Sequence, residues 1–189
     1  GMLKTEYSEL PLEVVDALAA SLSRVMTRMN DQEVCSTLHG FAKMNASWDG
    51  DETEKNGSGS ARLMPELRKS MLVCIASLAE IGALCLACTV YSLGMLGATW
   101  ERLPARIRYA LMLAAKSCSL RDQTISNVIY GLSLLKVQWA SLDTEFRDIL
   151  LDSMSQKDAY AKDTSSQHIA NTIWGLAKMD ASWDHLQGQ

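Results

Sequence analysis

The sequence predicts an all-α fold, an α-solenoid of stacked antiparallel helical hairpins with about eight helices. Four tryptophans end closely similar segments: FAKMNASW at Trp48, LGMLGATW at Trp100, LSLLKVQW at Trp139 and LAKMDASW at Trp183. These tryptophans lie 52, 39 and 44 residues apart. Periods of about 20 to 50 residues indicate repeated units that stack because no unit buries its apolar face alone.

The chain opens with half a unit. The segment YSELPLEVVDAL places Tyr7 where the other units have tryptophan, with Leu10 and Pro11 in the positions that follow. Leu10 corresponds to a leucine that opens the second helix of each later unit, which we name helix B. The first half unit therefore consists of helix B alone.

Helix B of each full unit follows its tryptophan. Apolar residues recur there in steps of four, as on one face of a helix. Pro11, Pro65 and Pro104 fall at the start of this helix, where a missing N–H costs nothing. The apolar positions are Leu63, Leu67 and Met71, then Leu103, Ile107 and Leu111, then Leu142, Phe146 and Leu150.

Helix A precedes each tryptophan, and four of its columns form a buried stripe. They stand fourteen, ten, seven and four residues before the tryptophan. The stripe comprises Val34, Leu38, Phe41 and Met44; Leu86, Val90, Leu93 and Leu96; Ile125, Ile129, Leu132 and Leu135; and Ile169, Ile173, Leu176 and Met179.

Glycine recurs inside helix A, at Gly40, Gly131 and Gly175. Because glycine in a helix costs about 0.5 to 1 kcal/mol relative to alanine, its return predicts a crossing too close for a side chain. The helix N-caps predicted from residue type are Asp31, Asp122 and Ser165 or Ser166.

The repeats divide one helical-repeat domain, residues 1–189, into five parts. An insertion of polar and glycine-rich residues, GDETEKNGSGSAR, predicts a flexible surface loop, with a short docking peptide as the alternative. The parts are an N-terminal half repeat at 2–30, repeat 1 at 31–80 with the insertion at about 49–62, repeat 2 at 81–119, repeat 3 at 120–160 and a C-terminal half repeat at 161–189.

Composition agrees with a helical body that has an ample core. Apolar residues make up 48% of the chain and charged residues 21%. No apolar run reaches the 18 or so residues that span a bilayer, and LKTEYSEL does not have the pattern of a signal peptide. Gly1 before Met2 is typical of tag removal. Five cysteines without framework spacing indicate a reducing, intracellular compartment.

Candidate catalytic and metal-binding residues are few. Cys85 and Cys88 form a lone CLAC segment, and a zinc or redox site needs further ligands. Cys35 and His39 stand four residues apart on helix A and could pair as nucleophile and base if a third group oriented the imidazole. Small buried residues and a packing role are the simpler interpretations. We therefore expect no enzyme activity, no cofactor and no metal.

Another face of helix A is a candidate binding surface. It comprises the columns sixteen, twelve and five residues before each tryptophan, where the units differ from one another. Variation at matched positions is where ligand specificity can lie. The candidate contacts are Gln32, Ser36 and Lys43; Leu84, Cys88 and Met95; Gln123, Asn127 and Leu134; and Gln167, Asn171 and Lys178.

Two ligand classes fit this face. Repeat proteins that read RNA use two or three side chains per unit, and amides such as those of Asn127 and Asn171 can donate and accept. The column nine residues before tryptophan, which is mainly aromatic, adds stacking. Leu84, Cys88 and Met95, however, form an apolar triplet that reads no base edge. A face that is merely solvated or interhelical is the remaining interpretation.

Arginine recurs in helix B, at Arg68, Arg108 and Arg147. Nucleic acid would favour such a basic ladder. However, three of the four tryptophans are followed by an acidic residue, Asp49, Glu101 or Asp184, and the net charge of −4 with a pI near 5.4 is not that of a strongly basic domain. We expect these arginines to pair locally with carboxylates or a helix end.

The helix A sequences resemble a known repeat family. QHIANTIWGLAKMDASWD and QTISNVIYGLSLLKVQWASL are similar to octotricopeptide repeats, helical pairs of 38 residues. Asn171, Thr172, Trp174 and Met179 are among the matching residues, whereas the second unit departs most. The resemblance implies an α-solenoid and an organellar RNA-binding factor. Similar Trp-containing repeats occur in effector proteins that bacteria deliver into host cells, which would imply the host cytosol.

These observations predict a non-enzymatic helical-repeat scaffold that mediates protein–protein interaction. The alternative is a sequence-selective single-stranded RNA-binding protein that acts in RNA processing or stability. We expect no membrane partner and no small-molecule substrate. Self-association through the C-terminal end is a further expectation, because that end lacks the polar cap that solenoids usually carry.

Overall fold

The computed structural model describes residues 5–48, 62–77, 81–156 and 165–186, and within these ranges the chain is an all-α array. Eight helices have 12 to 14 residues each, and a ninth is short. The helices are α1 Leu12–Val25, α2 Asp31–Lys43, α3 Pro65–Ser77, α4 Ala83–Met95, α5 Ala105–Ser117, α6 Asp122–Leu134, α7 Thr144–Ser155, α8 Ser166–Lys178 and α9 Trp183–Leu186.

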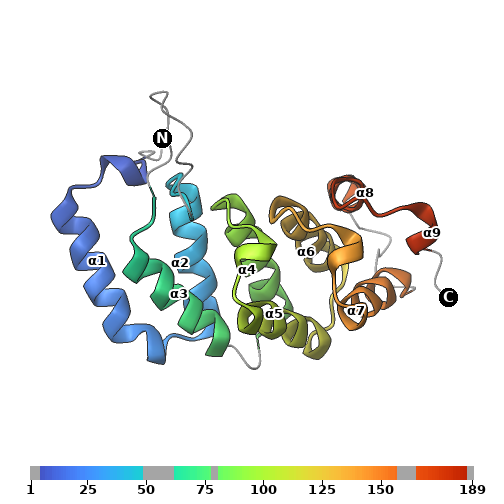
Figure 1. The fold of residues 1–189 in the computed structure, drawn as a ribbon, viewed down its shortest axis with the longest axis horizontal. Helices are drawn as coiled ribbons and strands as arrows, with labels where there is room; N and C mark the ends of the chain where they lie inside the picture. The colour runs from blue at the N-terminus through green and yellow to red at the C-terminus, as the bar shows by residue number, and fades with distance from the viewer. Residues whose placement is uncertain (1–4, 49–61, 78–80, 157–164, 187–189) are drawn as a thin grey trace.

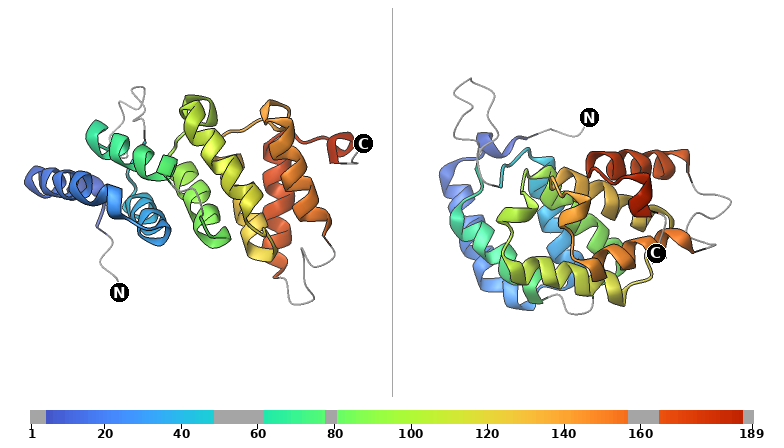
Figure 2. Two further views of the ribbon diagram at one scale, coloured as in Figure 1. Left: turned by 90° about the horizontal axis from the view of Figure 1, so that it is seen from below. Right: turned by 45° about the vertical axis from the view of Figure 1, so that its right-hand side comes forward.

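The eight long helices alternate between two rows. Helices α2, α4, α6 and α8 pack on one another in sequence and form the A row, while α1, α3, α5 and α7 form the B row. Figure 1 shows the helices following one another along the long axis, with α1 at one end and α8 at the other. Figure 2 shows the same order from two further sides. The predicted α-solenoid is confirmed.

Two residues after the end of each A-row helix, the chain passes through a residue with a positive φ angle. This residue stands three positions before the tryptophan: Asn45 at 57°, Gly97 at 76°, Lys136 at 57° and Asp180 at 56°. The residue after it donates its N–H back to a carbonyl five positions earlier, at 3.1 to 3.2 Å in all four units. This left-handed cap satisfies the last helical carbonyls and turns the chain sharply.

The tryptophan of each unit joins that unit to the next. Tyr7, Trp48, Trp100 and Trp139 are all at most 5% exposed. Their backbone N–H groups donate to backbone carbonyl oxygens at the ends of the following A-row helices. The acceptors are Met44, Leu96, Leu135 and Met179, in that order, at 2.7, 2.6, 2.9 and 2.7 Å. Tyr7 therefore occupies the tryptophan position, as predicted.

Glycines set the spacing of the A row. A Cβ on Gly131 would lie 2.7 Å from the Tyr91 nitrogen, and one on Gly175 would lie 3.1 Å from the Ile129 backbone. The predicted close crossing is confirmed at these two positions. At Gly40 it is wrong, because a Cβ there would meet nothing within 4 Å. No helix of the A row precedes α2 in the described chain.

Two of the predicted N-caps need correction. Asn30, not Asp31, caps α2, accepting the N–H of Glu33 at 2.9 Å. Asp122 begins α6 with a φ of 44° and does not cap it, because Arg121 takes the N-cap position. Ser165 does cap α8.

The buried stripe fails on α8. Ile169 is 45% exposed and Ile173 is 63% exposed, although their counterparts in the other three A-row helices are buried. Among the described residues, no further helix of either row packs on that side of α8. The predicted loop at 49–62 lies outside the described residues, except for Arg62. No described helix is long and apolar enough to cross a membrane.

Candidate ligand-binding face

The candidate contact residues lie together on one side of the A row. Positions sixteen, twelve, nine and five residues before the tryptophan fall within about 60° of the helix circumference, at roughly 100° per residue. None of these residues is buried. We name this surface the A face; it comprises Gln32, Ser36, His39 and Lys43; Leu84, Cys88, Tyr91 and Met95; Gln123, Asn127, Tyr130 and Leu134; and Gln167, Asn171, Trp174 and Lys178.

A continuous row of rings crosses the A face. The ring of His39 lies 6.4 Å from that of Tyr91, which lies 6.0 Å from Tyr130, which lies 5.1 Å from Trp174. The Tyr91 and Tyr130 rings are stacked with an interplanar angle of 29°, and the two outer pairs are tilted at 36° and 33°; all three centroid distances fall in the range of interacting aromatic pairs. Because α4, α6 and α8 approach one another closely at Gly131 and Gly175, one ring per helix is enough for contact between Tyr91, Tyr130 and Trp174.

The middle of the A face is apolar. Leu84 is 64% exposed and Met95 is 47% exposed, both on α4. Leu134 of α6 adjoins this region, because a Cβ on Gly94 would lie only 2.5 Å from the Leu134 Cβ. With Cys88 and Tyr91 between them, Leu84 and Met95 form an apolar column along the solvent side of α4, and contiguous exposed apolar patches mark interaction sites.

Polar groups surround this middle. Gln167 Nε2 donates to Asn171 Oδ1 at 2.8 Å, so two candidate contacts of α8 are already bonded to each other. Lys178 Nζ lies 5.3 Å from the centroid of the Trp174 ring, in a cation–π arrangement. Together with Lys43, the sixteen residues include two lysines and no carboxylate, although the whole chain carries a net charge of −4.

Cys35 and His39 each form a hydrogen bond with another residue rather than with each other. Cys35 Sγ donates to the Gln32 carbonyl at 3.3 Å, and His39 Nδ1 lies 3.4 Å from Ser92 Oγ. Burial, with smaller contributions from Cys88 and Cys85, raises the pKa of Cys35 to about 12. A thiol that keeps its proton at neutral pH is a weak nucleophile. These contacts are those of a packed thiol between two helices.

The CLAC segment belongs to the same helix contact. Cys88 Sγ lies 3.7 Å from the Cys35 carbonyl, and burial raises the pKa of Cys85. The five cysteines are free thiols. In the part of the chain that the structure describes, no group of three or more His, Cys, Asp or Glu side chains could hold a metal ion.

The arginine column lies on the B row, and its members have local partners. Arg68 Nη1 donates to the Trp48 carbonyl at 3.2 Å, and Arg108 Nη1 pairs with Glu101 Oε2 at 3.4 Å. Arg147 Nη2 donates to Thr144 Oγ1 at 3.1 Å. The expected pairing with a carboxylate is therefore found for Arg108, whereas Arg68 bonds to a backbone carbonyl and Arg147 to a hydroxyl.

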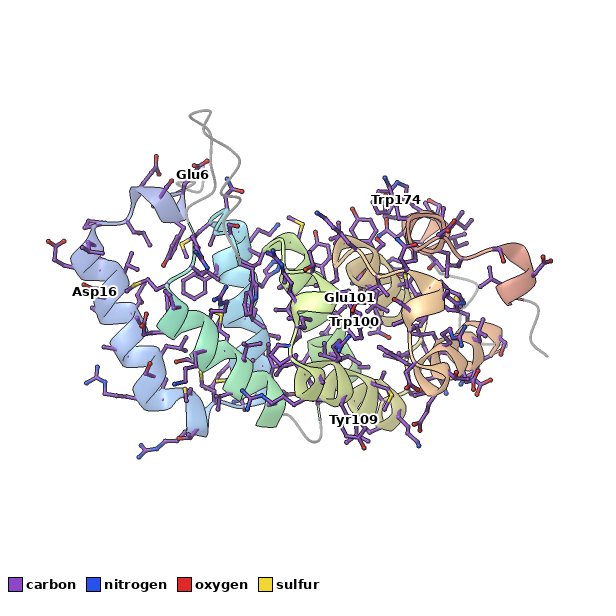
Figure 3. The ribbon with its side chains drawn as sticks, viewed as in Figure 1. Glu6, Asp16, Trp100, Glu101, Tyr109 and Trp174 are labelled. Atoms are coloured by element: carbon purple, nitrogen blue, oxygen red, sulfur yellow. The ribbon has the colours of Figure 1, made fainter. Side chains whose placement is uncertain are left out.

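The structure contains a cleft that the repeat pattern did not suggest. It has a volume of about 430 Å³ and lies between α5 and α7. Tyr109, which is 60% exposed, stands at its rim, and Trp100 and Phe146 line it. Figure 3 shows Tyr109 and Trp174 at opposite edges of the molecule, so this cleft and the A face are separate surfaces. Clefts depend on which side chains leave a gap, and periodicity carries no signal for that.

Comparison of the chain with known protein families, with curated proteins and with solved structures found no match. The octotricopeptide resemblance therefore depends on the repeat residues alone and stays a prediction. The fold defines an α-solenoid, and its ligand has to be inferred from the A face.

Proposed function

We propose that this protein is a non-enzymatic scaffold that holds a protein partner on the A face. The observation that carries the proposal is the exposure of Leu84 and Met95 in the middle of a face whose ends are polar. Protein interfaces have this layout, with an apolar centre that excludes water and a polar rim that fixes orientation. A nucleic acid would gain little from the two aliphatic side chains.

The rim supports a partner segment with polar or acidic ends. Lys43 lies on α2 and Lys178 on α8, on either side of the apolar α4. The amides of Gln123 and Asn127 offer donors and acceptors between them, which suits exposed backbone groups of a partner. Because the ring stack is held by close helix contacts, the face is organised before binding, which lowers the cost of association.

Single-stranded RNA is the second candidate. On α6 and α8, Asn127 and Asn171 each lie one helical turn from an aromatic ring of the stack, Tyr130 or Trp174. Amides combined with rings are the groups that read and stack on unpaired bases. The α6 and α8 half of the A face therefore favours RNA. The apolar side chains of α4 would then have no part in binding.

Parallel selections from a random displayed-peptide library and a randomised single-stranded RNA pool test both candidates. Each is run with purified chain at low and near-physiological salt, with duplex DNA as a control. We expect enriched peptides with apolar central residues whose binding survives the higher salt, since apolar contacts are not screened. Enrichment of an RNA motif that survives physiological salt, without enriched peptides, would instead establish the RNA candidate.

Two matched variants show whether a selected ligand uses the A face. Leu84→Glu places a charge in its apolar centre, and Leu12→Glu places the same charge on α1, where Leu12 is similarly exposed at 67%. We expect binding to be lost by at least about tenfold with the first and unchanged with the second, since a central apolar contact contributes more than about 1 to 2 kcal/mol. Equal affinities for the two variants would place the site elsewhere.

A further inference from the structure

The last A-row helix exposes apolar residues that every other unit buries. Ile173 is 63% exposed, whereas its counterparts Leu38, Val90 and Ile129 are all 0% exposed. Ile169 is 45% exposed, and its counterparts are at most 2% exposed. In the complete units this stripe of helix A is covered by helix B of the same unit and by the next A-row helix. Helix α8 therefore exposes an apolar face that fits a helix B and a further A-row helix.

The first B-row helix shows the converse. Val14 is 42% exposed and Leu18 is 41% exposed. Their counterparts on α5 and α7 are at most 2% exposed, because helix A of the same unit covers them. These counterparts are Ile107 and Leu111 on α5, and Phe146 and Leu150 on α7. Among the described residues, no helix A packs on the apolar stripe of α1.

Helix α2 offers the matching notch beside α1. In the array, Gly131 faces the backbone of Val90 and Tyr91, and Gly175 faces that of Ile129, so this glycine column receives the preceding A-row helix. At Gly40 the same notch is open. Thr37, one turn earlier, is only partly buried.

A groove marks the place of the missing helix. It has a volume of about 570 Å³, and its lining comes from the end of α1, the turn after it and the first turns of α2. The lining residues are Val25, Arg28, Met29, Glu33, Ser36 and Thr37. The notch at Gly40 and the stripe of Val14 and Leu18 continue the same surface.

We propose that two copies of this chain join head to tail, with α8 of one copy packed into the groove between α1 and α2 of the next. The joint would complete one repeat unit, since α8 supplies helix A and α1 of the next copy supplies helix B. Ile173 and Trp174 then meet Gly40, as Val90 and Tyr91 meet Gly131 within the chain. The interface thus continues the packing that already holds the A row together.

The position of Tyr7 sets the geometry of the joint. Its N–H donates to the Met44 carbonyl at 2.7 Å and its ring lies 5.7 Å from that of Phe41, so the tryptophan position beside α2 is already filled. In the joint, the segment after Met179 of the first copy therefore cannot take the path that Trp48 and Trp100 take within the chain. Because α1 and α8 lie at opposite ends of the long axis (Figure 1), the contact is heterologous, and it extends into longer chains of molecules.

Sedimentation velocity over a range of protein concentrations tests this joint. We expect the mean mass of the wild-type chain to rise with concentration and to pass that of a dimer. Ile173→Glu blocks the tail and Gly40→Glu blocks the head, so each variant alone should keep the mass of one chain. Both positions are open to solvent in one copy, so far-UV circular dichroism and the melting temperature should stay close to wild type.

Mixing the two variants gives the sharpest result. A head-blocked chain keeps an intact tail and a tail-blocked chain keeps an intact head, so an equimolar mixture should form dimers and stop there. A contact between two like surfaces would not be rescued by mixing. A wild-type chain that stays at the mass of one copy at every concentration, or a mixture that stays there, overturns the proposal.

One further variant separates this joint from the proposed function. Leu84 lies on the A face, away from both ends of the array. Leu84→Glu should therefore leave self-association unchanged and abolish binding of the partner. Ile173→Glu should do the opposite. Loss of association with Leu84→Glu would show that the A face, and not the head-to-tail joint, holds the copies together.

Discussion

The two rows of this solenoid are packed by different means. In the A row, Gly131 and Gly175 let the backbones of α4, α6 and α8 approach until a single Cβ at either position would collide with the preceding helix. In the B row, neighbouring helices are also in contact, but a cleft of about 430 Å³ lies between α5 and α7. Close packing fixes the distance between equivalent side chains of successive units, so the A row is suited to present a regular binding face and the B row is suited to support it.

The largest expected effect is on the free energy of unfolding, and it distinguishes a buried tryptophan from an exposed one. Trp139, which is 1% exposed, holds the junction between units, whereas Trp174 is 43% exposed on the A face. We expect Trp139→Ala to lower the free energy of unfolding by about 3 to 5 kcal/mol, as for other buried aromatic residues. Trp174→Ala should cost only about 1 kcal/mol, from lost ring stacking. Urea unfolding of both variants checks this, and equal losses would contradict the distinction between the surfaces.

The next effect compares a glycine that faces a neighbouring helix of the same chain with one that does not. Gly131→Ala places a methyl group 2.7 to 2.9 Å from the backbone of α4 and should destabilise the chain by about 1 to 3 kcal/mol. Gly40→Ala meets nothing and should stabilise it by about 0.5 to 1 kcal/mol, because alanine favours the helix. Opposite signs in the same unfolding assay are the expected result. A stabilising Gly131→Ala would mean that the A row is not closely packed.

A smaller effect is expected on the B row. The Arg108–Glu101 pair joins helix B to the turn before it, and Glu101 is 69% exposed. Exposed ion pairs contribute at most about 1 kcal/mol. Arg108→Ala should therefore change the unfolding midpoint little, and the change should shrink as salt is added. A loss as large as that of Trp139→Ala would give the arginine column a structural role that we do not assign to it.

The smallest effect is a pH dependence in the A row. Asp31 Oδ2 accepts the Gly82 N–H at 3.1 Å, and this bond lowers the pKa of the Asp31 carboxyl group. A lowered pKa in the folded state contributes stability above the unfolded-state value, and this stability is lost as pH falls through the folded-state value. Thermal unfolding of Asp31→Asn should therefore differ slightly from wild type at neutral pH and converge with it in acid. A difference that persists in acid would contradict the assignment.

Periodicity predicted most of the architecture because each unit repeats the same burial pattern. It identified the helices, the tryptophan position of Tyr7 and the columns that form the A face. It failed at the ends of the array, where Ile173 and Gly40 have the right residue types but no neighbouring helix. Burial depends on the neighbour, which a single unit does not encode.

Local chemistry was harder to predict than the repeat. Asp31 was expected to cap α2, but Asn30 stands one residue earlier and its side chain reaches the Glu33 N–H. Asp31 is then free to bond Gly82 of the next unit. The ring stack was visible only as a column of residue types, since the distances between rings depend on how closely the helices approach. The B-row cleft had no signal in the sequence.

The most direct test of the account compares the two rows as binding surfaces. A ligand selected as described above is titrated against wild type, Leu84→Glu on the A face and Tyr109→Ala in the B-row cleft. The account predicts an affinity loss of at least about tenfold for Leu84→Glu and none for Tyr109→Ala. A loss confined to Tyr109→Ala would contradict it and would assign the ligand to the cleft between α5 and α7.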